Sequence, residues 1–207
     1  MVQIGQIAPN FVQNSTDGLI EFHNWLEDSW CVLFSHPKNF TPVCTTELGE
    51  VARLKDEWGK RGVKVLGLSV DSLENHPIWA EDIAQTQGQT VNFPLLADDD
   101  RSVSALYGMV HPDSDPLLTV RAVFVIDPKK KVRLTLNYPP SAGRNFVEIL
   151  RIVDSLQLTD REKVSTPVNW KLGEKVIVSP MVSDDEAASR FPQGIEKQKD
   201  YLRYVKL

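Results

Sequence analysis

The sequence is poor in cysteine and has no long apolar run. Its 207 residues include only two cysteines, Cys31 and Cys44, too few for a disulfide scaffold and better suited to a reducing compartment. No stretch approaches the roughly 18 consecutive apolar residues that cross a bilayer. Residues 1–6 lack the charged and apolar regions of a signal peptide. We therefore expect a cytoplasmic protein with no membrane span.

Clustered basic charge is also scarce. The formal net charge is −5, and the one basic run, residues 129–131, follows Asp127 and Pro128 between two strand-like segments. That pattern is typical of a solvated turn, so we expect no nucleic-acid partner. The four histidines are scattered and no C-x-x-C pair occurs, so we expect neither a metal site nor a cofactor.

What is present is a pattern typical of a mixed α/β domain. Apolar residues at helical spacing between Leu48 and Trp58 predict a helix that connects two strands, which would then be parallel neighbours. The turn at 127–131 predicts a hairpin of two later strands. The strand candidates are 30–35, 63–70, 122–126 and 132–136, and the other expected helices are 78–87, 101–107 and 145–156.

The pattern changes after Leu158, where prolines interrupt short apolar runs. We therefore expect a main domain at residues 1–158 and a small α+β extension at 159–207. So short a segment makes a poor independent core, and we expect it to pack on another surface. The aromatic residues it would bury are Trp170, Phe191, Tyr201 and Tyr204.

Cys44 stands where a helix should begin. Thr41 suits the N-cap and Pro42 the first helical position, which puts Cys44 in the first turn. Unpaired backbone N–H groups and the helix dipole favour an anion there, so they favour the thiolate. The alternative is an ordinary helix start with a small buried thiol.

Four segments resemble one protein family in sequence and in order. Pro37, Thr41 and Cys44 fit the P-x-x-x-T-x-x-C signature of the peroxiredoxins, and residues 35–48 resemble the one-cysteine, peroxiredoxin-6-like subgroup of the AhpC/TSA family. Arg121 matches that family's active-site arginine. The remaining segments are 138–146, which resembles the subgroup's second arginine segment, and 165–170, which resembles its C-terminal extension. The resemblance implies a thioredoxin-like fold, a central mixed sheet flanked by helices, in a homodimer whose extension packs on the partner.

The chemistry that the resemblance implies is reduction of hydrogen peroxide or an organic hydroperoxide through a sulfenic acid on Cys44. Arg121 would stabilise the thiolate and hold a peroxide oxygen. Thr41 would orient the peroxide through its hydroxyl, Pro37 would shield the thiolate from water, and Val43 would contact the substrate. Without the resemblance, Arg121 reads as a surface arginine at a strand end.

Two further residues are candidates for supporting roles. His36 precedes Pro37 and, by the hypothesis the resemblance suggests, tunes Cys44 or helps its recycling; the alternative is a structural histidine. Arg144 is expected to be a charge behind the residues that touch substrate.

Cys31 is expected to be a buried core thiol, because it lies within a strand-like run. From Cys31 to Ser35 a strand advances roughly 13 Å at about 3.3 Å per residue, whereas a disulfide requires α-carbons within about 7 Å. The sulfenic acid would then wait for an external thiol, which the resemblance suggests is glutathione, a glutathione-transferase partner or a thioredoxin-like reductant. A peroxide-sensing switch or a holdase chaperone without fast turnover is the alternative function.

Some relatives in this subgroup carry a phospholipase site of Gly-x-Ser-x-Gly type with His and Asp. Here Ser29 and His23 occupy the corresponding stretch, but Cys31 replaces the closing glycine. Lys129 stands where the acid is expected, with Asp127 two residues earlier. A catalytic base needs an orienting acid, so we do not expect lipase activity.

Overall fold

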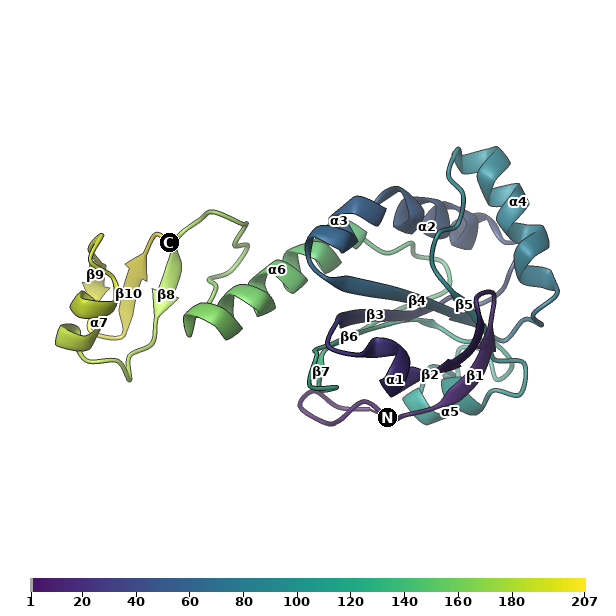
Figure 1. Cartoon of the computed structure of the whole chain (residues 1–207), viewed down its shortest axis with the longest axis horizontal. Coiled ribbons are helices and arrows are strands. Elements are labelled where there is room, and N and C mark those ends of the chain that lie inside the picture. The colour runs from purple at the N-terminus through teal and green to yellow at the C-terminus, as the bar shows by residue number, and fades with distance from the viewer. Residues whose placement is uncertain (1) are drawn as a thin grey trace. The chain divides into compact units, whose positions relative to one another are not determined.

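The computed structural model describes residues 2–207 and builds its larger unit around a seven-stranded sheet (Figure 1). In chain order its elements are β1 (Val12–Ser15), β2 (Gly18–Glu21), α1 (Phe22–Leu26), β3 (Trp30–Ser35), α2 (Pro42–Arg53), α3 (Lys55–Lys60), β4 (Val63–Ser69), α4 (Asn75–Gln87), β5 (Leu95–Ala97), α5 (Ser102–Tyr107), β6 (Arg121–Ile126) and β7 (Val132–Tyr138).

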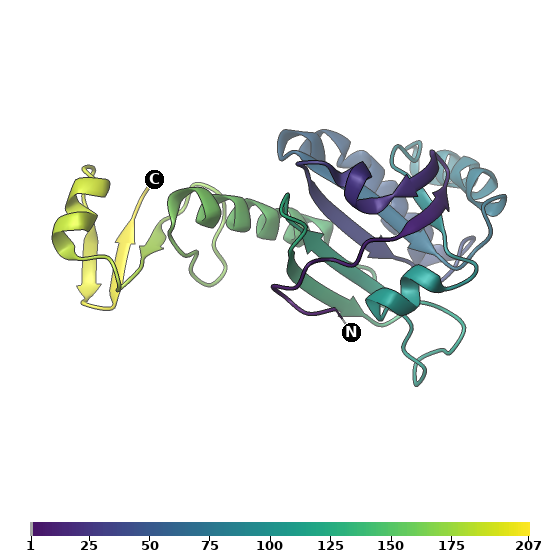
Figure 2. The same ribbon diagram turned by 60° about the horizontal axis from the view of Figure 1, so that its bottom comes forward.

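The sheet is mixed, with strand order β2-β1-β5-β4-β3-β6-β7. Strands β3, β4 and β5 are parallel to one another, and the outer pairings are antiparallel. Helices α2, α3 and α4 cover one face, and α1 and α5 cover the other (Figures 1 and 2). The predicted parallel neighbours and the predicted hairpin are both confirmed, as is the thioredoxin-like fold class.

The two faces of β3 lead to different parts of the core. Cys31 and Leu33 point into a buried cluster that includes Tyr107 of α5. Phe34 points to the opposite face, where the guanidinium of Arg144 lies 4.9 Å from its ring. That opposite face is the one that α2 covers, so Cys31 is directed away from the helix that carries Cys44.

The structure differs from the sequence-based elements of the larger unit in the following ways. The single helix expected from Leu48 to Trp58 is broken at Leu54 into α2 and α3. The indole N–H of Trp58 donates to the carbonyl of Val51 at 3.1 Å, which holds α3 against the end of α2. Elements β1, β2, β5 and α1 were not predicted, since none exceeds five residues and so short a run carries little periodicity.

The second compact unit comprises Val147–Leu207. Its elements are α6 (Phe146–Glu162, whose first residue belongs to the larger unit), β8 (Val176–Val178), α7 (Asp184–Arg190), β9 (Glu196–Lys199) and β10 (Leu202–Val205). The three strands form an antiparallel sheet in the order β8-β10-β9.

This unit has an apolar core of its own. Trp170 and Phe191 are buried in it. Tyr201 and Met181, by contrast, are exposed.

Candidate active site

Cys44 lies in the first turn of α2, beyond the carboxyl end of β3. Thr41 occupies the N-cap position with extended backbone, and Pro42 opens the helix, as the sequence predicts. The cysteine side chain is only 1% exposed. Thr41 does not cap the helix with its side chain; its hydroxyl donates instead to the Lys38 carbonyl at 2.9 Å. The N-terminal amides of α2 are therefore not occupied by the side chain of its N-cap residue.

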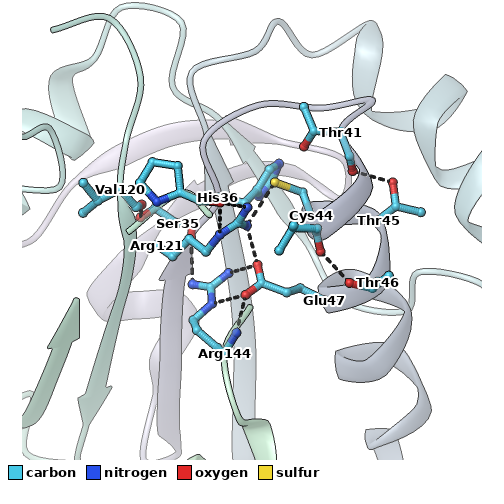
Figure 3. A network of polar contacts seen from close by, with 12 residues as sticks. Ser35, His36, Thr41, Cys44, Thr45, Thr46, Glu47, Val120, Arg121 and Arg144 are labelled. Atoms are coloured by element: carbon cyan, nitrogen blue, oxygen red, sulfur yellow. Dashed lines mark hydrogen bonds and ion pairs between the residues drawn. The ribbon is translucent and has the colours of Figure 1, made fainter. Parts of the chain in front are cut away.

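Arg121 points its guanidinium at this sulfur (Figure 3). It begins β6, the antiparallel neighbour of β3. Nη1 donates to the Cys44 Sγ at 3.2 Å, and Nε and Nη2 both donate to the Pro140 carbonyl, at 3.0 and 2.6 Å. The arginine is buried, so the alternative of a surface arginine is wrong.

Glu47 connects the two arginines and was missed by the sequence reasoning. Its Oε2 accepts from Arg121 Nη1 at 2.8 Å and from Arg144 Nη2 at 2.7 Å. Its Oε1 accepts from Nε and from the backbone N–H of Arg144, at 2.9 and 2.8 Å. A usable signal existed, because Glu47 follows Cys44 by three residues and therefore shares its helix face.

Arg144 is fixed from the sheet side as well. Its Nη1 donates to the carbonyls of Ser35 and Ala122, at 2.7 and 3.0 Å, so it ties β3 and β6 to Glu47. The guanidinium of Arg144 makes no hydrogen bond to Cys44 in the described structure, and Arg121 is the arginine that does.

The charges of this cluster do not balance without the sulfur. Two guanidinium groups face a single carboxylate, so one positive charge is unmatched until Cys44 becomes a thiolate. Burial alone would raise the pKa of Glu47, but hydrogen bonds and charge from Arg144, with the charge of Arg121, outweigh it and hold that pKa below its ordinary value. Glu47 is thus ionised at neutral pH and keeps both arginines in place.

His36 is fully buried between β3 and α2. Burial lowers the pKa of its imidazole to about 4, so the ring is neutral at pH 7. The ring lies 5.1 Å from that of Trp79, whose indole donates to the Thr45 hydroxyl next to Cys44. His36 therefore belongs to the wall of the site.

Pro37 and Val43 are held near the site by the chain itself. Pro37 is buried in the segment between β3 and α2, and Val43 is half-buried immediately before Cys44. A side chain built at Gly143 would stand 3.5 Å from Val43, so the segment before α6 approaches the first turn of α2 closely. Among the described contacts, no hydrogen bond connects Thr41 to the sulfur.

Cys31 has none of these features. It is fully buried, as predicted, and burial raises the pKa of its thiol well above the ordinary value. It faces the other side of the sheet, so it is an inert core residue.

The residues weighed for a phospholipase site are engaged separately. The His23 ring contacts the Ala8 carbonyl, and Asp127 accepts from the Lys131 amide and from Arg133 within the hairpin. Within residues 2–207 no hydrogen bond joins Ser29, His23 and Asp127. These three residues therefore form no Ser-His-Asp arrangement within the part of the chain that the structure describes.

Metal ligands and membrane spans are likewise missing from the part of the chain that the structure describes. No cluster of three or more histidine, cysteine or acidic side chains is placed to hold a metal ion there. None of the helices described has the length and apolar character needed to cross a membrane.

Comparison with known proteins agrees with this geometry. Residues 4–135 match the AhpC/TSA family, and residues 155–194 match the C-terminal domain of 1-Cys peroxiredoxin. The chain is 50% identical over 202 residues to the 1-Cys peroxiredoxin of Dictyostelium discoideum, covering 98% of this chain and 84% of that protein. It is 49% identical over 215 residues to Peroxiredoxin-6 of Mus musculus, covering 98% and 96%.

Solved structures agree as well. A mutant of the Peroxiredoxin 6 of Arenicola marina superposes with a TM-score of 0.94 at 46% identity, over 100% of this chain and 98% of that one. A yeast mitochondrial 1-Cys peroxiredoxin, whose thiol is resolved via glutathione/thioredoxin systems, gives 0.94 at 48% identity over 100% of both chains.

The fold is thioredoxin-like, and a buried cysteine at the start of a helix is contacted by an arginine. These features define the class of protein, and this chain belongs to the AhpC/TSA family. Within that family it is a one-cysteine peroxiredoxin, a thiol-dependent peroxidase that uses an external reductant.

Proposed function

We propose that Cys44 is the residue that reduces the peroxide. The single observation that carries this assignment is the 3.2 Å contact between Arg121 Nη1 and the Cys44 sulfur in a buried helix turn. The thiolate attacks one peroxide oxygen, the O–O bond breaks, and an S–O bond forms to give the sulfenic acid. The proton of the attacked oxygen goes to the departing oxygen, which leaves as water or an alcohol, and the sulfenate left on Cys44 takes one proton from solvent to become the sulfenic acid.

Arg121 has two tasks in this step. Before the attack it matches the charge of the thiolate, and during the attack it stabilises the negative charge that moves onto the peroxide oxygens. The Pro140 carbonyl accepts from Nε and Nη2 of Arg121. These bonds fix Nη1, the donor directed at the sulfur, before the substrate arrives.

Three more residues, Thr41, Val43 and Pro37, are proposed to act on the bound peroxide and its surroundings. The Thr41 hydroxyl orients the peroxide and Val43 contacts it, while Pro37 helps to exclude water. Hydrogen peroxide and organic hydroperoxides both present the O–O–H group that these residues address.

The reductant is proposed to be glutathione or a thioredoxin-like protein, with a glutathione transferase as a further candidate. The burial of Cys31 on the other face of the sheet supports an external thiol, since it leaves no second cysteine for Cys44. The similar yeast mitochondrial peroxiredoxin is resolved via glutathione/thioredoxin systems, which favours these two reductants here. The cytoplasm is the proposed location because it supplies both reductants.

We also propose that the extension, residues 159–207, packs on a partner subunit in a homodimer. Strongly exposed apolar side chains support this, with Met181 at 92% and Val168 at 87% exposure. Sedimentation equilibrium should give a dimer at micromolar concentration, and the double change Val168→Asp and Met181→Asp should give a monomer. A wild-type monomer would contradict the proposal.

The catalytic proposal is tested by peroxide consumption with each cysteine changed in turn. Reduced wild type and Cys31→Ser should consume hydrogen peroxide rapidly with glutathione or thioredoxin present, and Cys44→Ser should consume none. Slow oxidation without turnover by either reductant would instead favour the sensor or holdase role, which the enzyme relatives do not favour.

A further inference from the structure

A chain of buried hydrogen bonds runs from β5 to the active-site segment. His76 Nε2 lies 3.3 Å from the carbonyl oxygen of Leu96, and its Nδ1 lies 2.9 Å from Asn39 Nδ2. Asn39 Oδ1 lies 2.8 Å from His36 Nε2. All three side chains are buried, and the other ring nitrogen of His36, Nδ1, has no hydrogen-bond partner among the described residues.

The donor and the acceptor of each of these hydrogen bonds follow from the carbonyl of Leu96, at which the series ends. The Leu96 carbonyl can only accept, so His76 carries its proton on Nε2 and its Nδ1 is an acceptor. The Asn39 amide nitrogen then donates to that Nδ1, which turns its oxygen toward His36. Because this oxygen can only accept, His36 carries its proton on Nε2.

The reversed arrangement fails at the same carbonyl. Turning the Asn39 amide over would require His76 to donate from Nδ1, and a neutral ring would then set its Nε2 lone pair against the Leu96 oxygen at 3.3 Å. A doubly protonated His76 would avoid that clash. Burial, however, lowers the pKa of His76, although the charge of Asp71 opposes the shift, so the ring is neutral at pH 7.

We propose that Asn39 and His76 are positioning residues that fix the tautomer of His36, so that His36 presents an unprotonated Nδ1 to the active site. The segment is anchored for this purpose, since the backbone N–H of Asn39 donates to Asp71 at 2.8 Å. The His36 carbonyl also accepts from the Thr119 hydroxyl at 2.9 Å. Neither positioning residue touches the sulfur.

The tautomer decides whether His36 accepts or donates a hydrogen bond at Nδ1 during the reaction. This part of the inference rests on the proposed function. A neutral ring with a free Nδ1 lone pair accepts a hydrogen bond from the O–H of a peroxide or of the sulfenic acid. In the other tautomer Nδ1 would carry a proton and could not accept that hydrogen bond. The relay thus makes His36 an acceptor for the reacting O–H group.

The tautomer can be read directly by NMR on the full-length reduced protein labelled with nitrogen-15 in histidine. Long-range proton–nitrogen correlations at pH 7 should show His36 and His76 as single neutral rings protonated at Nε2. A His36 ring protonated at Nδ1, or protonated at both nitrogens, would overturn the proposal. This readout does not depend on peroxidase activity.

Two substitutions at His76 separate positioning from simple packing. His76→Leu removes the acceptor for Asn39, so His36 should lose its single tautomer and Cys44 oxidation should slow about tenfold, the loss of one typical hydrogen bond. His76→Gln can accept from Asn39 and donate to Leu96, so it should restore both the tautomer and the rate. His23→Gln, on α1, is the matched control and should change neither.

The outcomes also separate this inference from the proposed function. A single Nε2-protonated His36 in His76→Leu, or an unchanged oxidation rate in that variant, would overturn the relay and leave Cys44 as the peroxidase residue. A wild type in which Cys44 does not react with hydrogen peroxide would overturn the proposed function, while the tautomer spectra would still decide the relay.

Discussion

Replacing Glu47 by glutamine should destabilise the protein strongly although the shape of the side chain is kept. The Oε2 oxygen accepts from both Arg121 and Arg144. A neutral amide has one oxygen in place of two, so it loses the negative charge and two of the four hydrogen bonds that this carboxylate accepts. Each bond between charged partners is worth about 1.5–3 kcal/mol. The arginines retain their backbone carbonyl partners, so we expect a loss of about 3–5 kcal/mol in the free energy of unfolding, the usual cost of leaving buried charge unpaired.

The assay is urea unfolding of the reduced protein at one protein concentration, with Glu50→Gln as the control. Glu50 lies on the same helix but pairs with Arg53 near the surface, so its loss should cost less than about 1 kcal/mol. Equal effects of the two substitutions at pH 7 would refute the role given to Glu47.

The pH dependence gives a second check on the same variant. The folded pKa of Glu47 lies below its unfolded value of about 4.3. The contribution of Glu47 to the free energy of unfolding is therefore complete above its pKa in the unfolded state. It is lost as the pH falls through its pKa in the folded state. The stability gap between wild type and Glu47→Gln should stay constant from pH 7 to pH 5 and shrink below about pH 4. A gap that grows in acid would contradict the assignment.

Three further changes have distinct expected results. Arg121→Lys should slow Cys44 oxidation about 10²- to 10³-fold in stopped flow, because an ammonium cannot bind the sulfur, Glu47 and the Pro140 carbonyl together; a change below threefold would contradict this. Thr41→Val should slow the same step about tenfold without reducing helix content by circular dichroism, because its side chain does not cap α2. Ser183→Ala should cost about 1 kcal/mol by removing the side-chain cap of α7, seen as faster amide exchange confined to that helix.

The parts of the fold that the sequence predicts are those with strong local signals. Thr41 and Pro42 mark the start of α2, and the β-rich run at 30–35 marks β3. The break at Leu54 depends on a tertiary contact, the indole of Trp58 on the Val51 carbonyl, which no periodicity reports. The extent of α6 was underestimated, since its last turns to Glu162 carry mixed polar and apolar residues.

The site divides in the same way. Cys44, Arg121 and Arg144 could be recognised because each lies in a segment with a family pattern. Glu47 was overlooked although it lies one turn beyond the cysteine, since an acidic residue in a helix has an ordinary solvated reading. Asn39 and His76 could not be found from sequence. Their role depends on a hydrogen bond to the Leu96 carbonyl of β5, which only the fold brings near His76.

The most direct test is to locate the first oxidised sulfur. Reduced wild type, Cys44→Ser and Cys31→Ser would each receive one equivalent of hydrogen peroxide and a sulfenic-acid trap, followed by peptide mass spectrometry. A trapped adduct on Cys44 within seconds, retained in Cys31→Ser and absent in Cys44→Ser, is the expected result. A rapid disulfide between Cys31 and Cys44, or an adduct on Cys31 alone, would contradict the one-cysteine mechanism.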